Sequence, residues 1–332
     1  MPYLLVDPDD TDRVNQAVAI ERAARPVDDP SALEPNATLL SRLLRYGWDL
    51  EPDELYLYVP EGAPDPVGLL EVEFPRRDNL HLGWTSITVH PDHRRQGHGS
   101  AMMAEMIRRT EAVGRNTLWI GAPKDDEVAR TFAERFGFTY ASHDARRRQV
   151  LAEVDPAEVD RLHLQAREAA ADYVLERGTV PTPDDVLEQL VEVTAAINDA
   201  PMGDLTFEDE HFDLKRLQDF EAASAGREDV VYRLWARHRS TGEIGGHTVV
   251  MTNALQPGWA WQADTAVSRD HRGHRLGLLL KIEMMRWLAE DRPDVETIET
   301  WNNADNKFMI RVNEVLGYRL NRVFATYELK LG

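Results

Sequence analysis

Two short turns rich in arginine, histidine and glycine are the segments of this chain best suited to chemistry. The segment His93-Arg94-Arg95-Gln96-Gly97-His98-Gly99 recurs in the second half as His271-Arg272-Gly273-His274-Arg275-Leu276-Gly277. Each copy lies between a strand-like run and an apolar helix. Such a turn presents free backbone N–H groups, the positive end of a helix dipole and guanidinium donors, a combination that binds phosphate or pyrophosphate. The sequence therefore predicts two possible nucleotide sites.

The elements that must position these turns repeat in one order. In the first half, the pattern predicts strands at 3–7, 55–59, 67–74, 82–89 and 117–120, helices at 10–24, 38–46, 99–113 and about 125–135, and a last pair of strands after 138. In the second half, it predicts a helical, proline-punctuated connector at about 156–200, strands at 230–237, 244–251, 259–267, 297–301 and 324–329, and helices at 278–288 and 306–316. This repetition predicts a duplicated domain, divided into 1–155 and 156–332.

Composition limits the class of protein. A chain of 332 residues fits two domains, and 42% hydrophobic with 29% charged residues favours a globular fold. No apolar run is long enough to span a membrane, and the start lacks the features of a secretory signal, so we expect a cytoplasmic protein that does not bind membranes. The absence of cysteine excludes disulfides, thiolate metal sites and an acyl-cysteine intermediate.

The net charge of −20 limits the partners. Nucleic-acid binding needs a positive footprint, so we expect no nucleic-acid partner. The acidity is compatible with a cationic substrate such as an amine, and equally with a simple role in solubility. An anionic cofactor that approaches this surface needs local positive potential, which the two turns supply.

A strand, then Arg-x-x-Gly-x-Gly, then a helix resembles the acyl-CoA-binding motif of the GNAT acyltransferases, twice over nearly the whole chain. The resemblance implies an α/β (α+β) fold of two tandem GNAT-like domains, each a mixed, mostly antiparallel sheet flanked by helices. The first turn fits the family pattern at every fixed position. The second has Arg275 in place of the first glycine, which puts close backbone approach to a pyrophosphate in question, although an arginine also adds a possible phosphate contact.

A second family motif, Asn-x-x-Ala-x-x-x-Tyr-x-x-x-Gly-Phe, lies on the later helix of each half. In the C-terminal half Asn306 keeps the asparagine that contacts CoA in the family, but Asn313 replaces the tyrosine that often protonates the leaving thiolate. The N-terminal half has Asp126 and Ala133 at these positions. Neither half therefore offers the usual general acid.

The resemblance implies an N-acetyltransferase that moves an acetyl group from acetyl-CoA directly to a primary amine of a small molecule. The arrangement is similar to the tandem-domain mycothiol synthase group, in which one half can be weak in catalysis. A CoA-binding regulatory or scaffold protein, with one or both domains catalytically silent, is the alternative. The acceptor, the acyl length, the active domain and the choice between monomer and homodimer stay open.

The resemblance also implies the site residues. The candidate bases are Asp264, on the strand before the second turn, and Glu71 and Glu73, on the hairpin strand beside the first; His247 is a weaker candidate. Backbone N–H groups near Val89 and Val267 would polarise the thioester carbonyl. The expected CoA-binding residues are Ile87, Thr88, Val89, Arg94, Arg95, Gln96, Gly97, His98, Gly99, Ser100, Val267, Arg272, Gly273, His274, Arg275, Leu276, Gly277, Asn302 and Asn306.

Other interpretations of these residues fit less well. A dinucleotide fingerprint needs a third glycine, and Met102 stands in its place. The histidines of the two turns lie in loops, with no carboxylate to complete a metal site, so we expect no metal. The basic run Arg146-Arg147-Arg148 is interpreted as an exposed strand edge.

Overall fold

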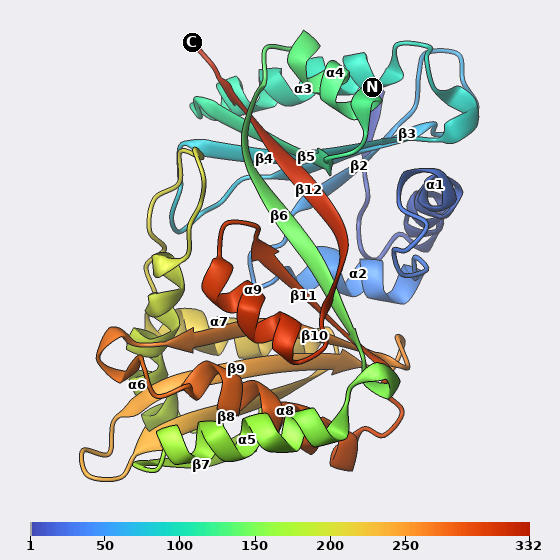
Figure 1. Cartoon of the computed structure of the whole chain (residues 1–332). Coiled ribbons are helices and arrows are strands. Elements are labelled where there is room, and N and C mark those ends of the chain that lie inside the picture. The colour runs from blue at the N-terminus through green and yellow to red at the C-terminus, as the bar shows by residue number, and fades with distance from the viewer. Residues whose placement is uncertain (1) are drawn as a thin grey trace. The chain divides into compact units, whose positions relative to one another are not determined.

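The computed structural model describes residues 2–332, which form two compact units (Figure 1). The first unit contains residues 2–122, 126–141 and 325–332, and the second contains residues 123–125 and 142–324. These bounds differ from the expected division into 1–155 and 156–332 because the units exchange segments. The end of the chain belongs to the first unit, and residues 142–155 belong to the second.

The first unit has a sheet with helices on both faces. Its strands follow the order β1-β2-β3-β4-β5-β12, in which β4 and β5 run parallel, while β1, β2, β3 and β4 pair antiparallel. The elements of this unit are β1 (Tyr3–Leu5), α1 (Thr11–Asp28), α2 (Ala37–Tyr46), β2 (Glu54–Tyr58), β3 (Gly68–Glu73), β4 (Leu82–Val89), the single turn η1 (Pro91–His93), α3 (His98–Ala112), β5 (Thr117–Pro123) and α4 (Glu127–Arg135), with the end of β12 (Arg319–Lys330).

The second unit repeats this arrangement in the order β6-β11-β10-β9-β8-β7, with β10 and β11 parallel. Its elements are β6 (Thr139–Val150), α5 (Pro156–Ala169), β7 (Tyr173–Thr179), α6 (Asp184–Ala195), α7 (Leu214–Gly226), β8 (Asp229–His238), β9 (Ile244–Asn253), β10 (Trp259–Val267), η4 (Arg269–His271), α8 (Leu276–Asp291), β11 (Thr297–Asn303) and α9 (Lys307–Val315). The two mixed, mostly antiparallel sheets flanked by helices confirm the predicted fold class.

Two expectations about strands were wrong. The pair of strands expected after residue 138 is the single long strand β6, and β12 from the far end of the chain takes the place beside β5. Within the first unit, Trp119 Nε1 donates to Glu328 Oε2 at 2.7 Å, and Leu331 N donates to Asn116 O at 2.8 Å. A pairing between segments so distant in sequence leaves no local pattern from which it could be predicted.

The second wrong expectation concerns the connector, where strand β7 lies within a segment expected to be helical. The alternation of this strand is hidden by Glu176 and Arg177, which are tolerated because β7 lies at the edge of the sheet and pairs only with β8. The run Arg146-Arg147-Arg148 was also misread. It belongs to β6, an internal strand, where Arg146 and Arg147 are buried and both Arg146 and Arg148 face the Glu299 carboxylate.

Alternate residues of β3 separate the two faces of the first sheet. Leu70 and Val72 pack with the methionines of α3, whereas Leu69 packs with Ala17 and Ile20 of α1. Side chains alternate along a strand, so Glu71 and Glu73 share the α1 face with Leu69. Helix α3 and the side chains of Glu71 and Glu73 therefore lie on opposite faces of the sheet.

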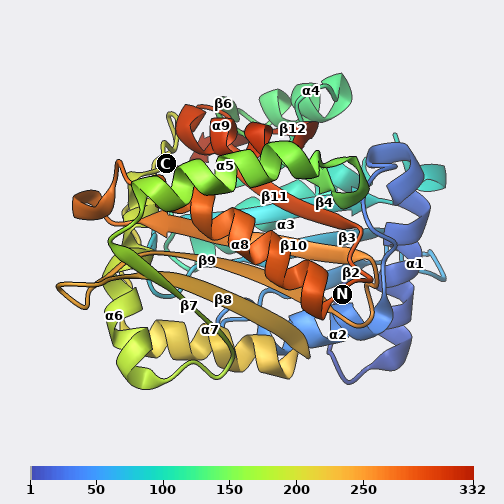
Figure 2. The same ribbon diagram turned by 60° about the horizontal axis from the view of Figure 1, so that its bottom comes forward.

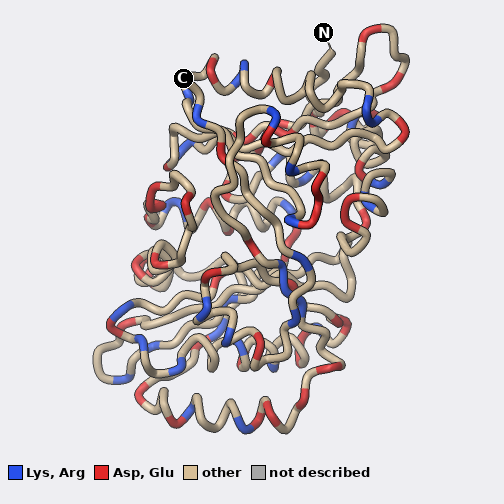
Figure 3. Tube along the Cα trace, turned by 45° about the horizontal axis from the view of Figure 1, so that its top comes forward, with Lys and Arg blue, Asp and Glu red and all other residues tan. Residues whose placement is uncertain are grey.

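The second sheet is covered on both faces, and β9 is buried along its whole length. Helices α6 and α7 cover one face, while α8 packs against the other together with α5, whose Val159, Leu162 and Ala166 join the same core (Figure 2). The first unit has no counterpart of α5 among its described elements. Charged residues of both signs are interspersed along the chain (Figure 3). No described helix has both the length and the hydropathy needed to cross a membrane.

Candidate functional site

Each sheet opens where its two parallel strands diverge. In the first unit β4 and β5 pair from Leu82↔Thr117 to Thr85↔Ile120, and β4 then continues to Val89 with β3 as its only strand partner. The backbone edge of residues 86–89 that faces β5 therefore has no strand partner in the described sheet. Ile87, Thr88 and Val89, which are expected to bind CoA, lie on this edge.

The second unit opens in the same way. Strands β10 and β11 pair from Trp259↔Thr297 to Gln262↔Thr300, and β10 continues beyond that point to Val267. Asn302, at the end of β11, also lies past the last pair. Both units thus have a fork between parallel strands that leads toward the helix following the turn.

The first turn leaves the start of α3 open. The backbone has positive φ at Arg95 (64°) and at Gly97 (90°), and Gly97 forms the N-cap without a side-chain hydrogen bond. By contrast, α1 and α4 are capped by Asp10 and Asp126. A Cβ atom on Gly97 would meet nothing within 4 Å. The uncapped N–H groups at the positive end of the helix dipole are therefore free to bind an anion.

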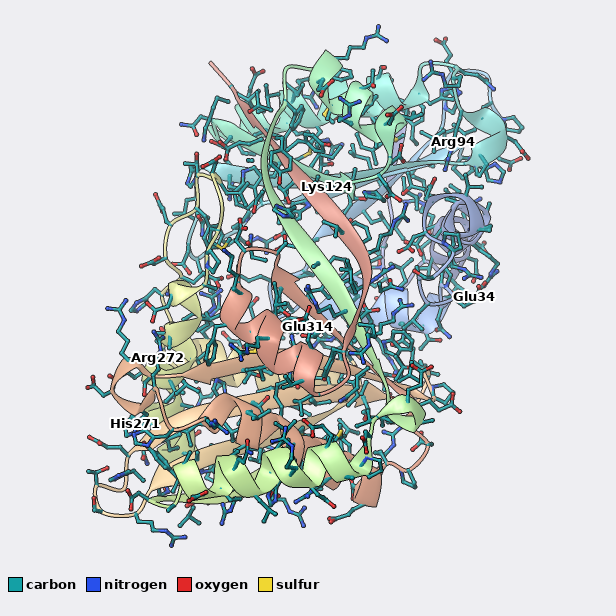
Figure 4. All side chains as sticks on the ribbon, in the orientation of Figure 1. Glu34, Arg94, Lys124, His271, Arg272 and Glu314 are labelled. Atoms are coloured by element: carbon teal, nitrogen blue, oxygen red, sulfur yellow. The ribbon has the colours of Figure 1, made fainter. Side chains whose placement is uncertain are left out.

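Arg94 holds the first turn in place. Arg94 is labelled in Figure 4. Its guanidinium donates to both carboxylate oxygens of Asp28, at 2.8 and 2.7 Å, and its Nε donates to the Val89 carbonyl at 2.9 Å. Because Asp28 and Val89 already accept from Arg94, those donors are not available to a phosphate. Arg95 and Gln96 are exposed.

The second turn has the same backbone with its glycine and arginine exchanged. Positive φ occurs at Gly273 (88°) and Arg275 (55°), so each turn has one arginine and one glycine at its two left-handed positions. Arg272, also labelled in Figure 4, repeats the role of Arg94. Its Nε donates to the Val267 carbonyl at 3.1 Å, and its guanidinium forms an ion pair with Asp199. Arg275 therefore preserves the shape of the turn although it departs from the family pattern.

Side chains of the second turn are held against α5 and β7. His274 Nδ1 lies 3.3 Å from the Ala169 carbonyl, Arg275 donates to Gln165 Oε1 at 3.0 Å, and the Tyr173 hydroxyl lies 2.8 Å from His271 Nδ1. Leu276 and Gly277, at the start of α8, are buried, whereas His98 and Gly99 at the start of α3 are half-buried. The second helix start is thus the more covered of the two.

Two candidate bases of the first unit lie beside its fork. Glu71 pairs with Ser86, the first residue of β4 past the last parallel pair, and Glu73 pairs with Trp84. Burial raises the pKa of Glu71 to about 7 and that of Glu73 to about 8, with a further contribution from the nearby Asp53 carboxylate. The Glu71 side chain still reaches solvent. A carboxylate with a pKa near neutrality suits a general base.

Asp264 occupies a bulge that β4 lacks. Strand β10 shifts register against β9 between Gln262 and Thr265, so Ala263 and Asp264 together face a single residue of β9. Bulges re-aim side chains next to active sites. Burial raises the pKa of Asp264, and the nearby Arg233 opposes that shift. The second fork therefore also has a carboxylate beside it.

The predicted residues on α9 have structural partners. Asn306 caps the helix by accepting from Met309 N at 3.1 Å, as Asp126 caps α4 by accepting from Ala129 N at 2.9 Å. Asn313, at the position of the family tyrosine, is fully buried and donates to Asn302 Oδ1 at 2.7 Å. The cap and the amide pair leave the CoA-contacting roles of Asn306 and Asn302 as predictions.

Several residues around the forks were missed by the sequence analysis. Glu21 and Asp53 join Glu71 and Glu73 in the first unit, and burial raises the pKa of Glu21 to about 7 and that of Asp53 to about 6. Arg233 and its partner Glu221 lie near Asp264 in the second. No motif marks any of these positions. Within residues 2–332, no three His, Asp or Glu side chains gather as a metal site would require.

Comparisons with known proteins agree with this geometry. Residues 19–138 match the model of the acetyltransferase (GNAT) family. A mycothiol acetyltransferase of Saccharomonospora viridis is 32% identical over 133 residues, 40% of each chain, and one of Stackebrandtia nassauensis is 33% identical over 120 residues, 37% of its length. The matched segment thus spans less than half of these two relatives. A mycothiol acetyltransferase of Streptomyces scabiei is 28% identical over 271 residues, 80% of this chain and 75% of its own.

Solved structures show the same fold over the whole length. A tandem GNAT protein from the clavulanic acid biosynthesis pathway superimposes with a TM-score of 0.82 at 24% identity, covering 99% of this chain and 98% of its own. A GCN5-related N-acetyltransferase from Sphaerobacter thermophilus gives a TM-score of 0.70 at 17% identity, covering 99% and 96%. The duplicated forks and turns, together with these similarities, identify residues 19–138 as a domain of the acetyltransferase (GNAT) family and show that the chain has the fold of tandem-domain GNAT proteins.

Proposed function

We propose that this protein transfers an acetyl group from acetyl-CoA to a primary amine of a small molecule, and that the first unit carries the reaction. One observation carries the proposal. The uncapped start of α3 and the unpaired edge of β4 lie at the fork between β4 and β5, and Glu71 lies beside the same fork on the face of the sheet opposite to α3. A donor bound along the turn and the fork would present its thioester to an amine on the α1 face.

The first unit's residues suit the steps of direct transfer. Glu71 takes a proton from the ammonium, either directly or through a water molecule, and the free amine attacks the thioester carbonyl carbon. The new C–N bond gives a tetrahedral intermediate whose oxyanion is stabilised by backbone N–H groups near Val89. The nitrogen then gives its second proton to solvent, and the C–S bond breaks as the carbonyl forms again. Ala133 replaces the usual tyrosine, so solvent supplies the proton to the thiolate.

Charge supports an amine acceptor in the first unit. Glu21, Asp53, Glu71 and Glu73 come from α1, the segment before β2, and β3, and they influence one another electrostatically. Clustered carboxylates raise the local affinity for a cation. The relatives named mycothiol acetyltransferases make a small molecule the acceptor class that we propose.

A glycine substitution tests the location of the donor. In Gly99→Glu, a carboxylate at the start of α3 should repel the pyrophosphate and reduce acetyl-CoA affinity at the first unit by about 100-fold or more. Gly99→Ala is the matched control, because a Cβ there meets the Phe132 ring at an ordinary 3.5 Å. Isothermal titration gives affinity and stoichiometry. Unchanged binding in Gly99→Glu would place the donor elsewhere.

A second candidate function concerns the second unit alone, which we propose as a CoA-binding or silent domain. The start of α8 is covered, which favours a domain without catalytic activity. Leu276 and Gly277 are buried there, and His274 and Arg275 contact α5. Gly277→Glu, with Gly277→Ala as control, tests this role in the same titration. A wild-type stoichiometry of two that falls to one in Gly277→Glu supports binding by the second unit. A stoichiometry of one in both proteins excludes it.

A further inference from the structure

One cross-strand pair has opposite charge in the two units. Gly68 faces Val89 in the first unit and Gly246 faces Val267 in the second, which aligns β3 with β9. On this alignment the pair Leu55↔Glu71 corresponds to Arg233↔Val249. The first unit thus has an acidic residue on one strand where the second has a basic residue on the neighbouring strand.

The fold itself does not require a charge at Arg233. Its counterpart Leu55 packs in an apolar cluster with Leu57 and Leu69, whereas Arg233 is only 2% exposed. His247, the counterpart of Leu69, is 1% exposed. Burying polar side chains is costly unless all their polar atoms find partners. Two buried polar residues in place of two leucines therefore indicate a role other than folding.

Several polar atoms around Arg233 lack partners. Arg233 donates to Glu221 Oε1 at 3.2 Å, and Glu221 Oε2 accepts from Thr182 N at 2.9 Å. Among residues 2–332, however, Arg233 Nε, His247 Nδ1 and Thr182 Oγ1 are buried without any hydrogen bond. Buried polar atoms are nearly always satisfied in native proteins, by protein, water or ligand. The Arg233 Nε–H in particular requires an acceptor oxygen.

The nearby Asp264 supplies the opposite charge. It influences Arg233 electrostatically, but the described residues show no ion pair between the two, and no hydrogen bond of the Asp264 carboxylate. A free carboxylate and a guanidinium with an unused donor therefore belong to one neighbourhood without contacting each other. This arrangement complements a small molecule with one anionic and one cationic end.

We infer that the α6/α7 face of the second unit binds a small zwitterion, whose carboxylate accepts from Arg233 and whose ammonium faces Asp264. His247 and Thr182 provide further hydrogen bonds to its polar atoms. The acidic cluster of the first unit, in contrast, suits a purely cationic amine. This inference concerns binding and stands without any acetyl transfer by either unit.

Matched ligand pairs test the inference without acetyl-CoA. Glycine, β-alanine and γ-aminobutyrate are compared with methylamine, ethylamine and propylamine, which differ from them only by the carboxylate. We expect at least one amino acid to bind the full-length protein about 10-fold or more tighter than its amine. Hydrogen exchange should show protection of β8 and α7. Equal affinity within all three pairs, or protection only in the first unit, would overturn the inference.

Substitutions then assign the carboxylate contact. The double variant Arg233→Leu/Glu221→Gln removes the guanidinium together with the charge of its ion-pair partner, and should lower the affinity for the best amino acid about 10-fold or more with little effect on its amine. Arg233→Lys is the milder variant if the double variant unfolds, and should also weaken binding because an ammonium lacks the Nε–H donor. Leu55→Met, at the position of the first unit that corresponds to Arg233, is the matched control and should leave both affinities unchanged. Unchanged affinity in every folded Arg233 variant would refute the contact.

Discussion

The two units of this protein have the same sequence of strands and helices, yet they differ in chemistry beside the fork. The first unit has Glu71 and Glu73 on β3, where the second has apolar Val249 and Met251. The second has Arg233, His247 and a bulged Asp264, where the first has leucines and a regular strand. After duplication, positions that are not needed for packing are free to acquire different charges, so a shared fold does not imply a shared substrate.

The turns before α3 and α8 show the opposite case, because their residues differ while their backbone geometry is the same. Each turn has one glycine and one arginine at its two left-handed positions, in opposite order. Each also has an arginine that donates to the last carbonyl of the preceding strand and pairs with an aspartate. The shape of the turn is therefore supported by contacts that do not depend on where the glycine stands.

The largest expected effect distinguishes Glu71, in the first unit, from Asp264, in the second, as the catalytic base. Glu71→Gln should lower kcat/KM for amine acetylation about 100-fold or more, while Asp264→Asn should leave a reaction of the first unit nearly unchanged. With the pKa of Glu71 at about 7, the base is deprotonated above pH 7, so activity should rise as pH increases through 7. Glu71→Gln should lose this rise. Initial rates of CoA release between pH 5.5 and 8.5 measure it.

Glu73→Gln is the matched control for that experiment. It changes a neighbouring group one pleat farther from the fork, so kcat should change less than in Glu71→Gln. Because Glu73, with a pKa of about 8, is still protonated when Glu71 titrates, the apparent pKa of Glu71 should stay nearly unchanged. A greater loss in Asp264→Asn than in Glu71→Gln would move the reaction to the second unit.

A smaller effect is expected on stability, from the buried faces of α3 and α8. Lys281 and Met103 occupy equivalent places, four residues after Gly277 and Gly99, and both are buried. The Lys281 ammonium lies 4.8 Å from the Tyr318 ring centroid, and burial lowers its pKa to about 7. Replacing it in Lys281→Met should raise the free energy of unfolding by about 2 kcal/mol at pH 6. Denaturant unfolding, monitored in each unit by hydrogen exchange, measures this increase in the free energy of unfolding.

The pH dependence of that gain has a definite sign. Between pH 7 and the normal lysine range, the unfolded chain binds a proton at Lys281 that the folded chain has released, so the wild-type stability rises with pH. The benefit of Lys281→Met should shrink over the same interval. Met103→Leu, which keeps an apolar side chain in the first unit, should show no such dependence, and an equal gain at pH 6 and pH 10 would contradict the assignment.

The smallest expected effect concerns the exchanged turn residues. Arg275→Gly should raise the free energy of unfolding of the second unit by up to about 1 kcal/mol, because glycine adopts positive φ without steric cost. Gly97→Arg should lower that of the first unit by a similar amount, since the added Cβ meets open space and only the backbone preference changes. Urea unfolding of each variant tests this symmetry. A loss of several kcal/mol in Gly97→Arg would mean that glycine is needed there for more than its conformation.

Local patterns in the sequence were sufficient for much of the fold. The predicted bounds of β4 and β10 match the observed ones because each strand is a short apolar run that ends at a turn signal. The turns were recognised because arginine and glycine recur there at fixed spacing. Strand β7 was missed because charged residues obscure its alternation, and the buried arginines of β6 were misread because a run of three charges resembles a solvent-exposed edge.

The sequence by itself determined two duplicated domains, the positions of both turns, and the carboxylates worth testing, because these depend on periodicity and on residues close together in the chain. Only the tertiary structure decided that β12 completes the first unit, that Arg94 and Arg272 are occupied by distant aspartates, and that Arg233 lies near Asp264. These facts depend on strand pairing and helix packing between segments far apart in sequence. Burial and charge are created by that packing, so they have no local signature.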